Sequence, residues 1–145
     1  MSLNLEEISW AIAKGATDEY EFEIRFRQFE NEPPTQKYSQ RLNIFWTMDE
    51  FFENGFPNEA ELEKLHSFEN RLIEAVENDE FSIMSMVLTG NGCREFVFHT
   101  PDPQEFINRL TNMPQESNAY PIEINCNEDP NWVYYYDEVE GIVGA

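Results

Sequence analysis

The stretch that decides the fold is FSIMSMVLTGNGCREFVFH, residues 81–99, in which two apolar runs flank Gly90-Asn91-Gly92. A run, a turn and a second run predict a β-hairpin at the centre of a sheet. The first run is largely apolar on both faces, which is typical of a strand covered on both sides. In the second run, Arg94 shares a face with Phe96 and Phe98. One positive charge is therefore expected among aromatic side chains.

The composition of the 145-residue chain predicts one domain, spanning residues 1–145, with a packed core, since 41% of its residues are apolar and 14% aromatic. Nine Lys and Arg residues against 29 Asp and Glu give a net charge of −20. Such a surface repels phosphate and anionic lipid, so we expect no direct binding to nucleic acid or membrane. It attracts a basic protein partner, although acidity can also serve solubility alone.

The sequence offers few residues for metal or redox chemistry. Cys93 and Cys126 make no disulfide framework or metal motif, although one bridge between them stays open. His66, His99 and the scattered carboxylates lack ligand spacing, and no phosphate-binding or nucleophile motif is present. We therefore expect no metal, no cofactor and no catalytic residue. Without a signal peptide or a long apolar run, a cytoplasmic location is expected.

Other segments supply further elements around the hairpin. Alternating apolar residues predict strands at 20–27, 41–48 and 120–126. A capping box at Asn58 and Glu61 predicts a long helix, and Asp102-Pro103 begins a shorter one. Residues 3–14 suggest one or two helical turns that end at Gly15, and Asp129-Pro130 begins a terminal segment.

These elements follow the order β-β-α-β-β-α-β, with helical pieces at the termini. We expect an α+β fold in which two helices lie on one face of a five-stranded mixed or antiparallel sheet. The last six elements can be interpreted as a ferredoxin-like core preceded by one extra strand.

Three sequence blocks carry a family resemblance: GFPNEAELEKLHSFENRL (55–72), LTGNGCREFVFH (88–99) and EDPNWVYY (128–135). The chain resembles domain-of-unknown-function family 695 over about residues 18–138, with departures at Asn70 and His99. The resemblance implies a fold and no particular reaction. Members are distantly similar to domains of the regulator of ribonuclease E activity, type B, which implies regulatory protein binding.

One charged residue interrupts the apolar face of the long helix. Glu69 falls within the arc of its leucines, and His66 lies at the edge of that arc. An unpaired carboxylate there would be costly, so we expect Arg94 as its partner in a structural ion pair. One alternative is a functional pocket formed by Glu69, His66 and Arg94, and another is a Glu69 side chain that reaches solvent.

The terminal aromatic residues allow two interpretations. Trp132, Tyr134 and Tyr135 can pack a terminal helix onto the sheet, or they can form a candidate protein interface, where Tyr and Trp are enriched.

Together, these features favour a non-catalytic interaction or regulatory domain whose acidic surface engages a basic protein partner, in an immunity-like or nuclease-regulating role. The alternative is a small enzyme or ligand-binding domain that uses the Glu69, His66 and Arg94 pocket. A closed seam between helix and sheet favours the first function, and an open cleft at Glu69 and Arg94 favours the second.

Overall fold

The computed structural model of the protein describes Leu5, residues 8–114 and residues 119–143. Within them the order is β1 (Trp10–Ala16), β2 (Glu21–Arg27), β3 (Gln40–Thr47), α1 (Glu59–Val76), β4 (Ile83–Gly90), β5 (Cys93–Thr100), α2 (Pro103–Thr111), β6 (Ile122–Glu128) and α3 (Val133–Val143). The strands form one antiparallel sheet in the order β1-β2-β4-β5-β3-β6. The predicted central hairpin is β4–β5.

The α+β class is as predicted, but the predicted architecture was wrong. We expected five strands, with one strand added to a ferredoxin-like core and two helices on one face. The described residues instead form a six-stranded, wholly antiparallel sheet with three helices. Two strands, β1 and β2, precede the unit that begins at β3, and the two form a hairpin at one edge of the sheet.

The additional strand is β1, in the segment that we expected to be helical. Residues 3, 4, 6 and 7 of that segment lie outside the described residues, and from Trp10 onward the chain pairs with β2, Trp10 opposite Arg27. Gly15, which we took for a helix end, is within this strand. A Cβ at Gly15 would lie 2.6 Å from the Phe22 ring, so the absent side chain lets that ring pack on the backbone.

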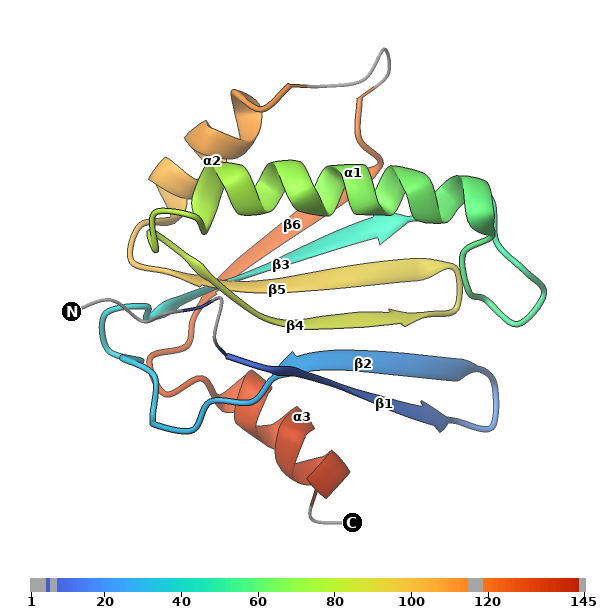
Figure 1. Ribbon diagram of the computed structural model, residues 1–145, viewed down its shortest axis with the longest axis horizontal. Coiled ribbons are helices and arrows are strands. Elements are labelled where there is room, and N and C mark those ends of the chain that lie inside the picture. Colours follow the sequence, from blue (N-terminus) through green and yellow to red (C-terminus); the bar gives the residue numbers. More distant parts are fainter. Residues whose placement is uncertain (1–4, 6–7, 115–118, 144–145) are drawn as a thin grey trace.

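The sheet is covered on both faces, but unequally (Figure 1). Helices α1 and α2 lie on one face, which we call the helix face, over an apolar core contributed mainly by the central strands and these helices. The third helix, α3, lies on the other, which we call the α3 face. The core of that face includes Ile24, Phe26, Met86, Val97 and Trp132.

Capping explains where α1 and α2 begin. The Asn58 side chain accepts a hydrogen bond from the Glu61 N–H at 3.0 Å, and that of Asp102 accepts one from the Glu105 N–H at 3.2 Å. Both predicted starts are thus observed. The Glu61 carboxylate does not complete the capping box, because it is buried and accepts from the Trp46 indole at 2.7 Å.

The two ends of the sheet differ in construction. At the end that we call the open end, to the right in Figure 1, lie the turns at residues 17–20 and 91–92 and the loop at 48–57. At the opposite end, the sealed end, the strands meet the junction between α1 and α2.

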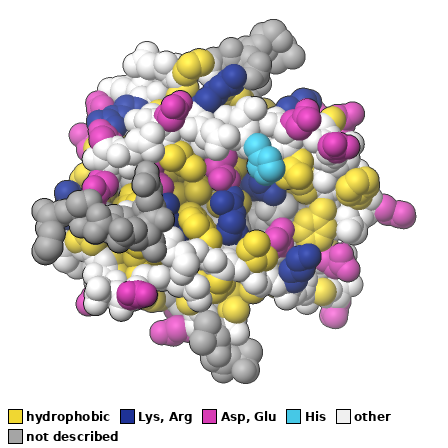
Figure 2. All heavy atoms as spheres, in the orientation of Figure 1, with side chains coloured by type: hydrophobic (Ala, Val, Ile, Leu, Met, Phe, Trp, Pro, Cys, Tyr) yellow, Lys and Arg dark blue, Asp and Glu magenta, His cyan; other side chains and the backbone are white. Residues whose placement is uncertain are grey.

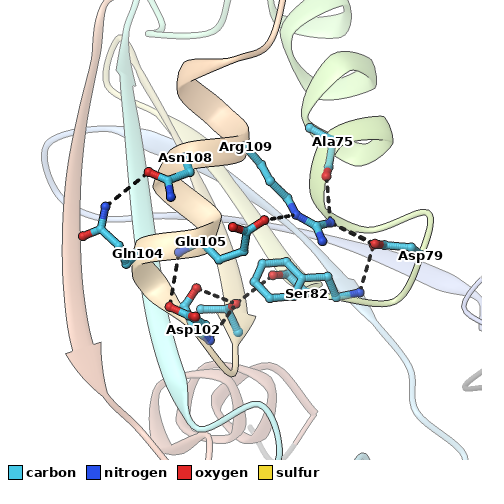
Figure 3. A network of polar contacts seen from close by, with 10 residues as sticks. Ala75, Asp79, Ser82, Asp102, Gln104, Glu105, Asn108 and Arg109 are labelled. Atoms are coloured by element: carbon cyan, nitrogen blue, oxygen red, sulfur yellow. Dashed lines mark hydrogen bonds and ion pairs between the residues drawn. The ribbon is translucent and has the colours of Figure 1, made fainter.

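Figure 3 shows this junction at the sealed end. Arg109 of α2 donates to the Ala75 carbonyl of α1 at 3.1 Å and pairs with Asp79 at 2.9 Å and Glu105 at 2.8 Å. Its guanidinium also lies 4.2 Å from the ring centre of Phe81. One arginine therefore joins the end of α1 to α2 and covers the start of β4.

Candidate functional site

Two concave surfaces lie toward the open end, one on each face of the sheet. The first is a cavity of about 300 Å³ on the helix face, lined by Ile12, Glu23, Arg25, His66, Glu69, Val87, Thr89 and Arg94. The second is a groove of about 360 Å³ on the α3 face, whose lining includes Tyr20, Phe22, Phe45, Leu88, Cys93, Glu95 and Glu138. We call them the helix-face cavity and the α3-face groove.

Glu69 belongs to the helix-face cavity, but its ion-pair partner was predicted wrongly. The carboxylate pairs with both terminal nitrogens of Arg25 on β2, with Nη1 at 3.2 Å from Oε2, instead of with Arg94. The pair is partly open, since 28% of the Arg25 side chain and 13% of the Glu69 side chain are exposed. Arg25 is the site residue that the sequence analysis missed.

Arg94 lies in the same cavity and is 8% exposed. Its Nε donates to Thr89 Oγ1 at 2.9 Å, while Nη1 and Nη2 make no hydrogen bond or ion pair with any described residue. Burial lowers the pKa of Arg94, and the nearby charge of Glu69 counteracts that shift. Arg94 thus remains a guanidinium with two donors that no side chain of the described chain uses.

The three residues predicted for a pocket do line one cavity. Glu69 and the exposed His66 are one helical turn apart on α1, and Arg94 is on the strand below them. Figure 2 shows Lys and Arg side chains gathered near the middle of the molecule as seen in the orientation of Figure 1, beside a His side chain. The seam between α1 and the sheet is therefore open at the position that the ligand-binding alternative requires.

The α3-face groove is mainly apolar in its floor and acidic at one end. Phe22, Phe45 and Leu88 are half-buried there, because α3 covers only part of this face. Glu95 accepts hydrogen bonds from Asn43 at 2.7 Å and from the Tyr134 hydroxyl at 3.0 Å.

The carboxylates at that end repel one another. Burial raises the pKa of Glu138, and the negative charges of Glu95 and Asp137 raise it further. Burial also raises the pKa of Tyr134, with Glu95 as the second cause. A positive charge placed at this end of the groove would counteract both pKa shifts.

A third surface, which we call the acidic tip, continues from the groove. It is a hollow of about 350 Å³ at the open end, with four exposed carboxylates from Asp18, Glu19, Glu21 and Glu53 in its lining. Tyr20 and Asn91 line both the groove and the tip. The groove and the tip therefore form one continuous surface.

The loop at residues 48–57 is held against this surface by backbone contacts. Gly92 N–H donates to the Gly55 carbonyl at 2.9 Å, and Met48 N–H donates to the Gly92 carbonyl at 2.9 Å. Gly55 has a φ of 90° and lies so close to Asn91 that a Cβ would be 2.7 Å from its nitrogen. Only glycine fits that approach, which fixes the loop beside the turn.

Two of the three aromatic residues proposed for an interface belong to the core. Trp132 is 0% exposed and Tyr135 is 3% exposed, so they pack α3 and its approach onto the sheet. Tyr134 is half-buried and bonded to Glu95, beside the groove. The exposed aromatic residues are elsewhere: Tyr20 at 38%, Phe51 at 49% and Phe52 at 58%.

The remaining reactive side chains do not form a site. His99 is buried against Trp132 and shares a 2.8 Å hydrogen bond with Ser85, itself fully buried. Cys93 and Cys126 are free thiols. Among the described residues, no three His, Cys, Asp or Glu side chains are grouped to hold a metal ion, and no helix has the length and apolar character to cross a membrane.

Fold and surfaces together define an acidic α+β protein with a concave surface on each face of one sheet. The chain belongs to the Family of unknown function (DUF695), whose model matches residues 9–138. That region includes every strand, α1, α2 and the first half of α3. Comparison with curated proteins and with solved structures gave no match.

Proposed function

We propose that this protein is a non-catalytic interaction domain that binds a basic, partly apolar segment of a partner protein on the α3 face. The open helix-face cavity, which favours the ligand-binding alternative, is on the other face and leaves this surface free. The segment would lie along the α3-face groove and reach the acidic tip. The observation that carries the proposal is the continuity of these surfaces through Tyr20 and Asn91, with carboxylates at both ends and apolar side chains between them.

The groove supplies the apolar contact that a stable interface needs. Phe22, Phe45 and Leu88 form its floor, and burial of such side chains is the main favourable contribution to most protein association. At the tip, Tyr20 provides an exposed aromatic side chain among carboxylates, and Phe51 and Phe52 are exposed in the adjoining 48–57 loop. Aromatic anchors surrounded by a polar rim are typical of protein interfaces.

Charge determines the class of partner. Glu95 and Glu138 repel each other at one end of the groove, so a Lys or Arg side chain there is favoured over any neutral group. Over longer distances the net charge of −20 steers basic surfaces toward the protein and raises the association rate. A nuclease regulator or an immunity protein would be one form of such a domain. The two free thiols suit the cytoplasm, in which we place it.

A peptide titration tests the proposal. The probe is a helical peptide with lysine on one face and leucine on the other, and its control carries glutamate for lysine. We expect the basic peptide to bind the native protein, and Glu95→Gln/Glu138→Gln to weaken it about tenfold, since hydrogen bonds to charged groups contribute about 1.5–3 kcal/mol. Glutamine keeps the acceptor oxygen used by Asn43 and Tyr134.

A matched pair of substitutions separates groove binding from general charge attraction. Glu63→Gln/Glu74→Gln removes the same charge from exposed positions on α1, on the opposite face. We expect this variant to bind the peptide nearly as tightly as the native protein. Equal weakening by both double variants would overturn the groove as the binding surface.

The two cysteines give a second readout that applies to a natural partner. Cys93 lines the groove, while Cys126 is exposed on the edge strand β6. In an extract of the producing cells, a bound partner should protect Cys93 from alkylation and leave Cys126 reactive. We expect salt to remove that protection, because screening weakens attraction between exposed charges. Equal labelling of Cys93 with and without extract, at low salt, would count against the proposal.

A further inference from the structure

The helix-face cavity contains two charges that satisfy each other and two that do not. Arg25 and Glu69 form an ion pair, whereas the Arg94 Nη atoms and the Glu23 carboxylate make no hydrogen bond or ion pair with any described residue. Both groups line the cavity, where the charges of Glu69 and Glu23 attract Arg94 without a direct contact. Arg94 is more than nine-tenths buried, and a buried charge without a partner is costly.

Strand register determines how these two charges are placed. Glu23 on β2 is opposite Thr89 on β4, and Thr89 is opposite Arg94 on β5. Glu23 and Arg94 therefore stand on either side of Thr89, about 10 Å apart at the backbone, because neighbouring strands are about 4.8 Å apart. Thr89 holds Arg94 through its Nε. The negative and positive groups are thus at opposite ends of one short polar row.

The neighbouring row supplies an apolar wall. Ile12 and Val87 flank Arg25 on the adjacent strands, and both line the cavity. Ile12 is 61% exposed, so its side chain is accessible to a ligand in the cavity. The cavity volume of about 300 Å³ is at the lower limit for small-molecule sites, which are about 300–1,000 Å³.

The charges exclude two simpler kinds of ligand. With Arg25 paired to Glu69, an anion with two or more charges would meet one arginine, Arg94, and would be repelled by Glu23 and by the overall charge of −20. A cation alone would leave the buried Arg94 uncompensated. A ligand that has one charge of each sign and no net charge satisfies both ends.

We propose that the helix-face cavity binds a free α-amino acid as its zwitterion, with the carboxylate on Arg94 and the ammonium group on Glu23. The planar guanidinium donates two parallel hydrogen bonds to a carboxylate, which is the geometry that the unused Nη1 and Nη2 offer. An aliphatic side chain of the ligand lies against Ile12 and Val87. This site is on the opposite face of the sheet from the α3-face groove, so the two proposals stand or fall separately.

The test is a titration of the native protein with each standard amino acid, followed through the backbone amide NMR signals of Arg25 and Arg94, which line this cavity and not the α3-face groove. We expect at least one aliphatic amino acid to give saturable shifts below ~10 mM, the range of weak small-ligand binding. Its N-acetyl derivative lacks the ammonium charge and its amide lacks the carboxylate. Each should bind at least about tenfold more weakly, since one charged contact is lost.

Substitutions assign the two ends of the ligand. Arg94→Gln should weaken the amino acid about tenfold or more, and so should Glu23→Gln, because each loses one charge-assisted contact. Lys64→Gln and Glu74→Gln are the matched controls, since they remove one charge of each sign from exposed positions on α1 outside the cavity. Both controls should leave the affinity within about twofold, because screening weakens exposed charges at that range. Circular dichroism of every variant confirms folding.

Two results would overturn this proposal. One is the absence of shifts at Arg25 and Arg94 with every amino acid at ~10 mM, a concentration that detects even weak binding. The other is equal binding of the N-acetyl derivative, which would show that Glu23 takes no part. In either case, the result expected from the peptide titration of the α3-face groove does not change.

Discussion

The sealed end and the open end of the sheet each have one ion pair that joins β2 to α1 or to its C-cap residue, Glu77, and the two pairs have different surroundings. Arg27 and Glu77 pair at 2.6 Å with 6% of each side chain exposed. Arg25 and Glu69, two residues earlier on β2 and two helical turns earlier on α1, are 28% and 13% exposed. The same elements thus make one closed pair and one that borders a cavity.

Neighbouring groups explain the closure at the sealed end. The second oxygen of Glu77 accepts from the Met84 N–H at 2.7 Å, which has no counterpart at Glu69 among the described residues. The ring of Trp10 lies 4.8 Å from the Arg27 guanidinium and 5.1 Å from that of Arg25, so it contacts both pairs. Arg27 Nε and Nη1 are buried and have no partner among the described residues. Cation–π contact with Trp10 offsets part of that cost. Such a pair holds β2 and α1 in register and offers nothing to a ligand.

Because one of these two ion pairs is buried and the other borders a cavity, an ion pair between helix and sheet does not by itself indicate a site. At the open end the decisive feature is the second pair of charges, Glu23 and Arg94, which the first pair leaves uncompensated. The three concave surfaces described above lie toward this end. Toward the other end lie the tight aromatic packing around Trp132 and a hollow of about 530 Å³ between the end of β2 and α3, whose lining includes Phe29 and Tyr136. The predictions below test whether stability and binding divide in the same way.

The largest effect is expected for Trp132→Ala at the sealed end. Trp132 is fully buried, its indole donates to the Tyr38 carbonyl at 2.8 Å, and its ring stacks on His99 at 3.9 Å. Loss of a packed Trp costs about 3–5 kcal/mol, so chemical denaturation should show a decrease of that size in the free energy of unfolding. Truncation before Asp129 should lower stability at least as much. An unchanged melting curve would show that the terminal segment does not pack on the sheet and does not stabilise the sealed end.

The second prediction compares the two ion pairs directly. Glu77→Ala leaves Arg27 charged and buried and should cost about 3–5 kcal/mol. Glu69→Ala leaves the more exposed Arg25 and should cost about 1 kcal/mol or less, since solvent screens partly exposed pairs. The measurement is urea denaturation of both variants under identical conditions. Equal costs would remove the distinction between the two ends.

Much of the central fold could be predicted from local patterns. The hairpin of β4 and β5, the Asn58 cap of α1 and the Asp102 cap of α2 depend on turn and capping residues close together in sequence. The burial of Trp132 was the structural alternative for the terminal aromatic residues, and it is the one observed. These features can be predicted without knowing which strands are neighbours in the sheet.

Strand order is what the sequence could not provide. Arg25 was assigned correctly to a strand, but its contact with Glu69 requires β2 to pair with β4, a neighbour more than 50 residues away that no local pattern specifies. The strand β1 was missed because small residues fill one of its faces, so its alternation is weak and Gly15 resembles a helix end. An arginine on the half-buried strand 20–27 was the available signal for the missed partner.

The third prediction concerns the pH dependence of the sealed end. Burial lowers the pKa of His99 from 6.5 to about 3, with the charge of Arg41 as a second cause. The unfolded chain therefore binds a proton below about pH 6.5 that the folded protein does not bind until about pH 3. His99 thus contributes a loss of stability, of the order of a few kcal/mol, as the pH falls through this window.

His99→Gln isolates this effect from the many carboxylates, since glutamine can still bond Ser85 but does not titrate. The difference in unfolding free energy between the native protein and this variant should shrink as the pH falls from 6.5 toward 4. NMR titration of the two imidazoles provides a direct check, with the exposed His66 as the internal comparison. A His99 signal that titrates near pH 6.5 would show that the site is open to solvent.

The smallest stability effect is expected for Arg94→Met at the open end. From burial alone, an arginine that is 8% exposed should behave like Arg27, and its loss should be costly. Arg94, however, has no carboxylate within ion-pair distance, so the substitution leaves no buried carboxylate without its partner. Methionine keeps most of the volume and removes a charge that burial destabilises. We therefore expect urea denaturation to show a change within about 1 kcal/mol, in either direction. A cost as large as that of Glu77→Ala would show that Arg94 is a structural residue and that the cavity around it is incidental. A stable protein that no longer binds amino acids would show that Arg94 is retained for the ligand, at the end of the sheet where the fold does not need it.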